Sequence, residues 1–185
     1  MSVPDITLAE ALNQIGHIKD RIDKNKERIA KYSSMLSSEK PYFSSEEEQK
    51  KEVEKLVQSN MDLVTLYLKL KTSIEYTNMC TLTEIDGKIY SISDIVRLQM
   101  KAGKMIISTY ESLDDKSAES RKRGVQTVEG KVPQVVRLYS EEYKNKNLDK
   151  WRDLVDPHGT FESRKRVLNA TIKLKEFITP APETV

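Results

Sequence analysis

Apolar side chains recur at every seventh position from Leu8 to Leu36, and this repeat constrains the fold more than any other feature. A seven-residue repeat with a second set of positions between its members places one continuous apolar stripe along an α-helix. Thr7 and Glu10 fit a capping box, which predicts that the helix begins at Leu8. A stripe of this length has to be buried against another helix. Its two sets of positions are Leu8, Ile15, Ile22, Ile29 and Leu36, and Ala11, Ile18, Asn25 and Tyr32.

A second stripe follows a serine-rich loop, SSMLSSEKPYFSSEEE, whose glutamates suit the first turn of a new helix. From about Ser45 to Tyr76 the same alternating three-four spacing returns, at Val53, Leu56, Asn60, Leu63, Tyr67, Leu70 and Ile74. Two helices of similar length joined by a short loop pack antiparallel, because each has a stripe to bury. We expect Asn25 and Asn60 to mark the register of this pair. The residues expected to face inward are Ile15, Ile22, Ile29, Leu56, Leu63 and Leu70.

An Asp86-Gly87 pair predicts a β-hairpin in the middle of this helical chain. A two-residue hairpin turn needs positive φ at both central positions, and the flanking Thr, Ile and Tyr residues favour strands. The expected strands are Thr81–Ile85 and Lys88–Ser91. Two strands alone are marginally stable, so they have to pack on a helix or pair with strands of another subunit.

The rest of the chain predicts shorter elements. Ser91 and Asp94 fit another capping box, so a third helix is expected from Ile92 to about Leu113. The charged stretch DDKSAESRKRG is expected to be a loop. A second, shorter hairpin is expected around Glu129 and Gly130. Two further helices are expected in SEEYKNKNLDKWRDLVD and TFESRKRVLNA.

These elements predict a mainly α fold, in which a long antiparallel helical hairpin of coiled-coil type is joined by a third helix and one or two small β-hairpins. Residues 1–115 are expected to hold the helical hairpin, the β-hairpin and the third helix. Residues 116–185 are expected to form a smaller α+β region that packs on the first as one elongated unit.

Composition excludes several classes of function. The 31 basic residues nearly cancel the 29 acidic ones, so no global field attracts nucleic acid or anionic lipid, and neither is expected as a partner. One cysteine and two histidines cannot supply a Cys/His zinc site. The sequence contains no run of about 18 apolar residues, so no membrane span is expected, and its first residues lack the features of a signal peptide.

We expect no catalytic, cofactor-binding or metal-binding residues and no small-molecule substrate, and hence no enzyme. His17 has Asp20 and Arg21 nearby in sequence, which would suit a proton relay, but a solvated helix histidine is the simpler interpretation. Cys80 has no histidine close in sequence and no glycine-rich elbow, which favours a small buried side chain over a nucleophile.

Three groups of residues are candidates for partner contact. Tyr42 and Phe43 are adjacent aromatics in the serine-rich loop, where they either anchor in a partner's pocket or cap the end of the helical hairpin. The β-hairpin offers unpaired strand edges to a second subunit, with Ile85 and Ile89 as contact residues. The basic cluster comprises Arg121, Lys122 and Arg123. Simple solvation is its first interpretation, and as a contact it suits an acidic protein surface better than nucleic acid.

Three stretches carry a family resemblance: TLAEALNQIGHIKDRIDKNKERI, IEYTNMCTLTEIDGKIYSISDIVRLQ and LNATIKL. In this order they resemble the opening helix, the central hairpin and the closing element of the septicolysin-like family of small helical proteins. The resemblance covers about half of the chain and includes relatives among the structural proteins of tailed bacteriophages. It implies a protein of the virion.

The sequence therefore predicts a non-enzymatic structural or assembly protein that acts through helix and β-hairpin contacts. The expected setting is a bacteriophage particle, as a tail, neck or capsid-associated component, with copies of itself and other structural subunits as partners. The alternative is a cytoplasmic coiled-coil adaptor or a weak nucleic-acid-binding protein.

Overall fold

The computed structural model of the protein describes residues 5–124 and 133–177. The fold is mainly α-helical with a small two-stranded antiparallel sheet, which confirms the predicted class. The chain separates into two compact units. Unit 1 comprises Met1–Leu82 together with Val167–Val185, and unit 2 comprises Thr83–Arg166. This division differs from the predicted boundary after residue 115, because residues 172–175 are hydrogen-bonded to the first two helices and the residues next to them.

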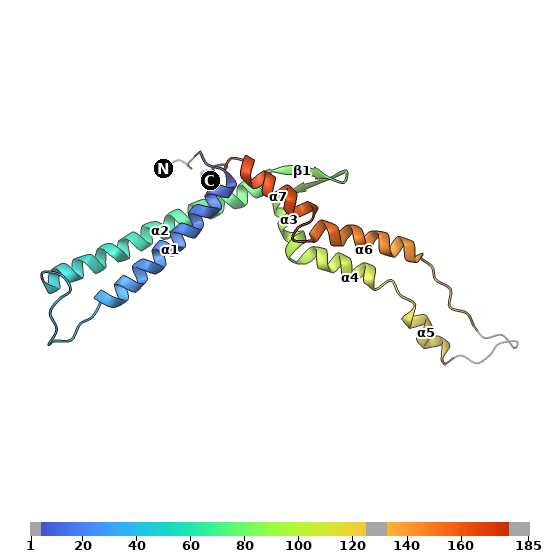
Figure 1. Ribbon diagram of the computed structural model, residues 1–185, viewed down its shortest axis with the longest axis horizontal. Coiled ribbons are helices and arrows are strands. Elements are labelled where there is room, and N and C mark those ends of the chain that lie inside the picture. The colour runs from blue at the N-terminus through green and yellow to red at the C-terminus, as the bar shows by residue number, and fades with distance from the viewer. Residues whose placement is uncertain (1–4, 125–132, 178–185) are drawn as a thin grey trace, which may run out of the picture. The chain divides into compact units, whose positions relative to one another are not determined.

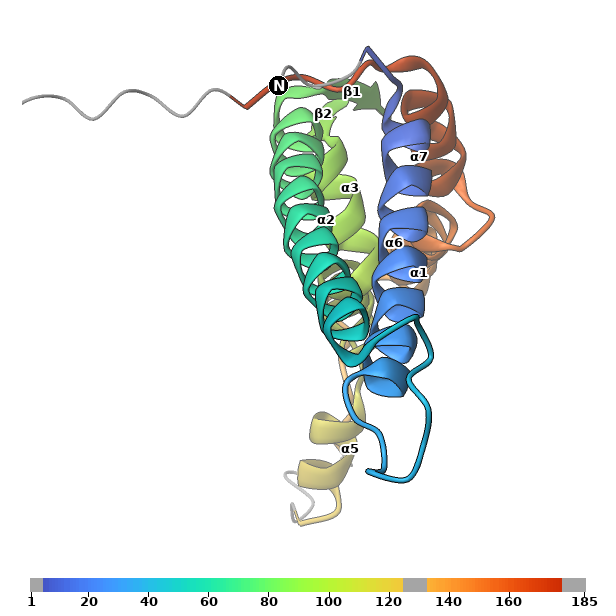
Figure 2. The same ribbon diagram turned by 90° about the vertical axis from the view of Figure 1, so that its left-hand side faces the viewer.

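Unit 1 is built on the predicted helical hairpin. Helices α1 (Leu8–Tyr32) and α2 (Glu46–Cys80) run antiparallel and lie side by side in both views (Figures 1 and 2). Of the six residues expected to face inward, Ile15, Leu56, Leu63 and Leu70 are buried, whereas Ile22 and Ile29 are half-buried. These six residues therefore lie along the seam between the two helices.

The ends of α1 follow from local chemistry. The Thr7 side chain accepts a hydrogen bond from the Glu10 N–H at 3.3 Å, and the Thr7 N–H donates to the Glu10 carboxylate at 2.7 Å, so the predicted capping box is present. The helix ends at Tyr32, one turn earlier than the heptad repeat implied. Leu36 lies in the loop with 65% of its surface exposed.

The predicted polar register markers face each other across the seam. Asn25 Nδ2 donates to Asn60 Oδ1 at 2.9 Å, and Asn60 Nδ2 reaches the Ile22 carbonyl at 3.4 Å. A half-buried amide pair of this kind disfavours slipped alignments, which would leave both groups without these partners.

The segment after the last helix closes unit 1. The Leu8 N–H donates to the Ile172 carbonyl at 3.0 Å and the Leu174 N–H to the Ile6 carbonyl at 2.8 Å. The Lys175 N–H then donates to the Thr77 hydroxyl at 2.9 Å. These bonds hold the segment to α1 and α2, a long-range pairing that no local pattern predicts.

The predicted β-hairpin lies in unit 2, apart from its first residue, Leu82. Strands β1 (Leu82–Ile85) and β2 (Lys88–Ser91) pair around a turn in which Asp86 and Gly87 have φ values of 50° and 73°. Both values are positive, as the predicted turn requires.

The third helix is present but interrupted. It runs as α3 (Ile92–Arg97), a π-helical turn η1 (Leu98–Ala102) and α4 (Gly103–Glu111), and it begins with the predicted Ser91–Asp94 capping box. Helix α6 (Glu141–Val155) packs against α4. The close approach depends on Gly103, because a Cβ added there would lie 2.5 Å from Val155 Cγ1.

The core of unit 2 contains one buried side chain each from β1, α3, α6 and a fourth element. The fourth element, α7 (Thr160–Thr171), contributes Phe161, whose ring packs edge-on against Tyr90 at 5.3 Å between centroids. The boundary between the two units falls within α7. The buried core residues are Ile85, Ile95, Leu154 and Phe161.

Two expectations for the middle of unit 2 are affected by the structure. Residues expected to form a loop instead contain helix α5 (Lys116–Lys122), because the stretch is rich in Lys, Ala, Glu and Arg, which favour helix. The turn of the second hairpin, Glu129 and Gly130, lies outside the described residues. Residues 133–140, which are described, form no strand.

Candidate interaction surfaces

Helix α2 carries a second apolar stripe, which we call the outer stripe: Val57, Met61, Val64 and Leu68. These side chains are 46%, 60%, 40% and 59% exposed, whereas Leu56, Leu63 and Leu70 of the inner seam are buried. Each outer residue directly follows a residue of the inner seam, and one residue turns an α-helix by about 100°. The outer stripe therefore forms a separate face of α2, next to the face that contacts α1.

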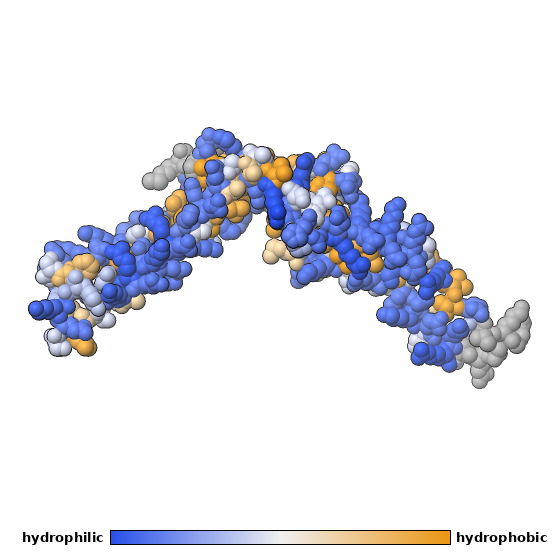
Figure 3. Space-filling view, viewed as in Figure 1, coloured by the Kyte–Doolittle hydropathy of each residue, from blue (hydrophilic) through white to orange (hydrophobic). Residues whose placement is uncertain are grey.

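Helix α1 has no comparable stripe. Its exposed large apolar side chain is Leu12, and most of its other exposed residues are polar or charged. On the face shown in Figure 3, hydrophilic side chains dominate the hairpin, with hydrophobic patches between them. An apolar row at regular helical spacing on such a surface is typical of a helix that contacts another helix.

Sequence reasoning missed the outer stripe although its signal is present. The spacing of Val57, Met61, Val64 and Leu68 is four, three and four residues, the same rhythm as the inner seam shifted by one position. Because the two rows are offset by one residue, the spacing of apolar residues alone does not distinguish two apolar faces of α2 from a single broad one.

The aromatic pair of the loop packs on the end of α1. The Tyr42 and Phe43 rings lie 5.4 and 5.2 Å from the Tyr32 ring, and Lys31 Nζ lies 5.0 Å above the Tyr42 ring. This arrangement supports the interpretation that the pair caps the helical hairpin. Tyr42 nevertheless stays 58% exposed, so its contact with a partner remains a prediction.

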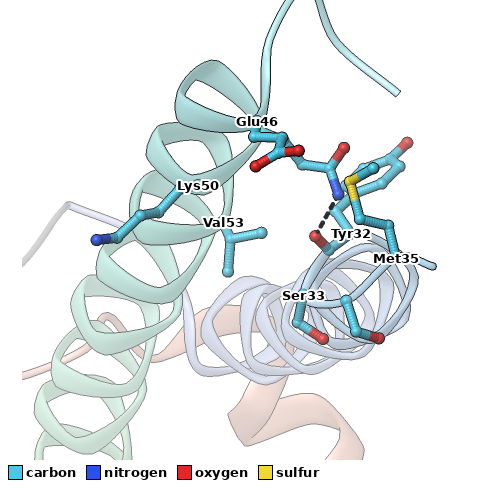
Figure 4. A pocket seen from close by; sticks show the side chains of 8 residues that line it. Tyr32, Ser33, Met35, Glu46, Lys50 and Val53 are labelled. Carbon is cyan, nitrogen blue, oxygen red and sulfur yellow. Dashed lines mark hydrogen bonds between the residues drawn. The ribbon is translucent and has the colours of Figure 1, made fainter. Parts of the chain in front are cut away.

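A recess of about 310 Å³ lies at the same end of the hairpin, between Tyr32 to Met35 and the first turns of α2 (Figure 4). Gln49 spans it: its Nε2 donates to the Tyr32 carbonyl at 2.8 Å, and its Oε1 accepts from the Tyr42 N–H at 2.9 Å. One end of this buried amide binds the last residue of α1 and the other binds the loop, so Gln49 has a structural role. Lys50 extends from α2 away from Tyr32 and Met35 (Figure 4).

The two β-hairpin candidates differ in exposure. Ile89 is 70% exposed on β2 and is free to contact a partner. Ile85 is 7% exposed within the core of unit 2, which is a correction to its assignment as a contact residue. The two share the sheet, but strand alternation places them on opposite faces, one toward the core and one toward solvent.

The basic cluster lies at the end of α5. Arg121 and Arg123 are exposed and Lys122 is half-buried, and none of the three forms an ion pair with another described residue. The structure thus places no acidic partner from the described part of the chain beside the cluster, and its function stays a prediction.

A charged network that the sequence did not predict joins α7 to η1. Glu162 accepts from Lys165 Nζ at 2.6 Å, Arg166 Nε at 3.1 Å and Gln99 Nε2 at 3.2 Å, and Lys165 also donates to Gln99 Oε1 at 2.9 Å. The hydrogen bond from Lys165 is the largest of several causes that lower the pKa of Glu162 to about 2. The network fixes the π-helical turn against α7.

The residues weighed for catalysis are not assembled into a site. His17 is exposed, and within the described residues no hydrogen bond joins it to Asp20. Cys80 is exposed rather than buried, and its hydrogen bond with Tyr76 raises the pKa of the Tyr76 hydroxyl. In the ranges 5–124 and 133–177 there is no cluster of metal-ligating side chains. No helix in these ranges is long and apolar enough to span a membrane.

Comparison with known proteins adds information on the fold. No protein-family model and no curated protein matches the chain, so the resemblance to the septicolysin-like family remains a prediction. The crystal structure of a functionally unknown conserved protein from Corynebacterium diphtheriae is similar, with a TM-score of 0.54 and 16% sequence identity. The match covers 93% of this chain and 100% of the other. At this identity the similarity shows a shared fold alone.

Proposed function

We propose that the protein is a non-enzymatic assembly protein that associates with other subunits through the outer stripe of α2. The observation that carries the proposal is the row formed by Val57, Met61, Val64 and Leu68, four apolar side chains that are each at least 40% exposed. Burying such side chains contributes about 25 cal/mol per Å² of apolar surface, which favours association over exposure to water.

The particle of a tailed bacteriophage is the setting that the proposal favours. Support comes from the resemblance of three stretches to structural proteins of such phages and from a helical hairpin stabilised by its own seam, which leaves the outer stripe for partners. A cellular adaptor that uses the same face of α2 is the alternative. It differs in location rather than in mechanism.

A second candidate function is weak nucleic-acid binding through the basic cluster of α5. The favouring observation is the exposure of Arg121 and Arg123 without ion pairs to described residues. Three charges would give weak binding that falls steeply with salt. The test is retention of the protein on a DNA column before and after replacement of all three residues by Ser. If retention is unchanged by the replacement, the cluster is not the DNA-binding site.

The direct test compares the mass of the native protein, alone and in extracts of whole particles, with the 21.3 kDa of a single chain. Met61→Glu places a charge in the middle of the outer stripe and should return the protein to the mass of a monomer in both samples. Burying a charge that has no partner carries a desolvation cost. We therefore expect Met61→Glu to lower the affinity by at least about 100-fold.

Met105→Glu is the matched control, because Met105 is 57% exposed on α4 of unit 2, close to the 60% of Met61. It changes charge and apolar surface equally but lies outside the outer stripe, so assembly should persist. If both variants assemble like the native protein, α2 does not carry the association and the proposal is wrong.

A further inference from the structure

Charged residues extend the outer stripe at both ends with the same spacing. Lys50 and Glu54 precede Val57, and Lys71 and Glu75 follow Leu68, so one face of α2 reads Lys, Glu, Val, Met, Val, Leu, Lys, Glu at intervals of four and three residues. None of the four charged side chains forms an ion pair with another described residue. The charges are therefore available to a partner that lies along the apolar row.

This row matches a second copy of itself when the two helices run antiparallel. About a two-fold axis between Asp62 and Leu63, Met61 lies opposite Val64 of the other copy and Val57 opposite Leu68. The same alignment places Lys50 opposite Glu75 and Glu54 opposite Lys71. Apolar residues then meet apolar residues, and every charge meets its opposite.

Other occupants fit less well. Two copies running parallel in register would oppose Lys50 to Lys50 and Glu54 to Glu54, which is repulsive at both ends. A partner of uniform charge would attract one member of each Lys–Glu pair and repel the other. The alternation of sign at each end is satisfied by the antiparallel copy.

The position of the stripe on α2 leaves room for this partner. The outer face is turned by about 100° from the inner seam, so α1 and a second α2 can contact the helix at once. Two hairpins joined in this way form an antiparallel four-helix arrangement with the two α2 helices in contact, a common solution for helices with two apolar faces. Closed two-fold symmetry is also the commonest form of soluble homo-oligomers.

We infer that the protein forms a two-fold symmetric homodimer in which the outer stripes of two α2 helices pair antiparallel, with Lys50 facing Glu75 and Glu54 facing Lys71 of the other copy. The inference rests on the proposed function and deepens it, because it names the partner and the register. It concerns α2 alone and does not require the β-hairpin edges.

Charge exchange within one chain tests the register. Lys50→Glu makes like charges face each other at two symmetric places and should weaken the dimer about tenfold, as should Glu75→Lys. The double variant Lys50→Glu/Glu75→Lys restores opposite charges and should return the dissociation constant to within about threefold of the native value. The two positions are about 37 Å apart on one helix, so no contact within a chain can explain the rescue. Sedimentation velocity at low ionic strength measures all four constants.

Lys24→Glu on the polar outer surface of α1 is the control for net charge. Lys24 is exposed and the change in charge equals that of Lys50→Glu, so the dissociation constant should not change. If a single charge reversal weakens the dimer and the double variant does not restore its dissociation constant, the register is wrong. The register is also wrong if neither single reversal changes the dissociation constant. In either case the loss of assembly in Met61→Glu would still support the proposed function.

Disulfide formation tests the direction of the helices independently. In a Cys80→Ser background, chains with Val57→Cys and chains with Leu68→Cys should form a covalent dimer when they are mixed and oxidised. Either variant oxidised by itself should form little covalent dimer. Covalent dimers of Val57→Cys alone would indicate parallel helices and overturn the inference. A protein that stays monomeric at all concentrations and is also absent from larger assemblies would overturn both the inference and the proposed function.

Discussion

The two units bury their apolar side chains in different ways. In unit 1 the buried residues of the seam come from two helices and recur at regular spacing, as Ile15 on α1 and Leu56, Leu63 and Leu70 on α2. In unit 2 the core has no period, because Ile85, Ile95, Leu154 and Phe161 come from β1, α3, α6 and α7. A periodic seam distributes stability along its length, whereas a core with one contribution from each element depends on every member.

The largest expected effect concerns the centre of the unit 2 core. Phe161→Ala should lower the free energy of unfolding of unit 2 by about 3 to 5 kcal/mol, because the ring is fully buried and leaves a cavity. Trp151, the single tryptophan, packs against this core, so its fluorescence during denaturation reports on unit 2. Far-UV circular dichroism follows the helices of both units.

The same experiment shows whether the two units are stabilised separately. If they are stabilised separately, the fluorescence midpoint of Phe161→Ala should move much further than the midpoint of the remaining helical signal. Coincident transitions in the variant would show that the two units unfold as one cooperative body.

Two leucines of α2 test the seam of unit 1. Leu70→Ala should destabilise unit 1 by about 2 to 4 kcal/mol, because the side chain is 1% exposed. Leu68→Ala removes the same atoms two positions away, where 59% of the side chain is exposed, and should change the stability of the dilute monomer by at most about 0.5 kcal/mol. Equal effects in circular-dichroism denaturation would contradict the assignment of inner and outer stripes.

The comparison also explains how far the sequence predicted the fold. Periodicity and capping boxes are local signals, so the start of α1, the hairpin of α1 and α2, the turn at Gly87 and the start of α3 were predictable. The return of residues 172–177 to α1 and α2 and the meeting of Ile85 with Phe161 depend on contacts far apart in the sequence. No spacing rule encodes such contacts.

The candidate surfaces were predicted less well for two physical reasons. Alternation in a short strand does not reveal which face is buried, so Ile85 was assigned to the surface although it belongs to the core. The outer stripe was hidden because a helix with two apolar faces resembles one with a single broad face until the angle between the faces is considered. Tyr42 keeps both of its possible roles, since it packs on Tyr32 and is still exposed.

Two glycines give a smaller effect with opposite signs in the two units. Gly103→Ala should destabilise unit 2 by about 1 to 3 kcal/mol, because the new Cβ would lie 2.5 Å from Val155 Cγ1 and 2.6 Å from the Leu98 carbonyl oxygen. Gly16→Ala, in α1 with nothing within 4 Å of the new Cβ, should stabilise unit 1 by about 0.5 to 1 kcal/mol through helix propensity. Thermal unfolding followed by circular dichroism measures both. A neutral Gly103→Ala would mean that α4 and α6 adjust their packing easily.

The smallest effect is the pH dependence of the charged network around Glu162 in unit 2. The hydrogen bond from Lys165, aided by those from Gln99 and Arg166, lowers the pKa of Glu162 from 4.5 to about 2. A carboxyl whose pKa is lower in the folded state stabilises that state above its unfolded pKa and loses this contribution as the pH falls through the folded pKa. Stabilisation by Glu162 is therefore complete above about pH 4.5 and disappears toward about pH 2.

Glu162→Gln removes this contribution and should cost about 1 kcal/mol at neutral pH, a modest value because solvent screens the exposed Arg166. The difference from the native protein should shrink as the pH is lowered below about 4.5, since protonation then removes the same charge from the native side chain. Denaturation followed by Trp151 fluorescence at several pH values measures the difference. Glu142→Gln, at an exposed position of α6 without an ion pair to a described residue, is the control and should show no comparable trend. A difference for Glu162→Gln that stays constant with pH would mean that the carboxylate's charge does not stabilise α7 against η1.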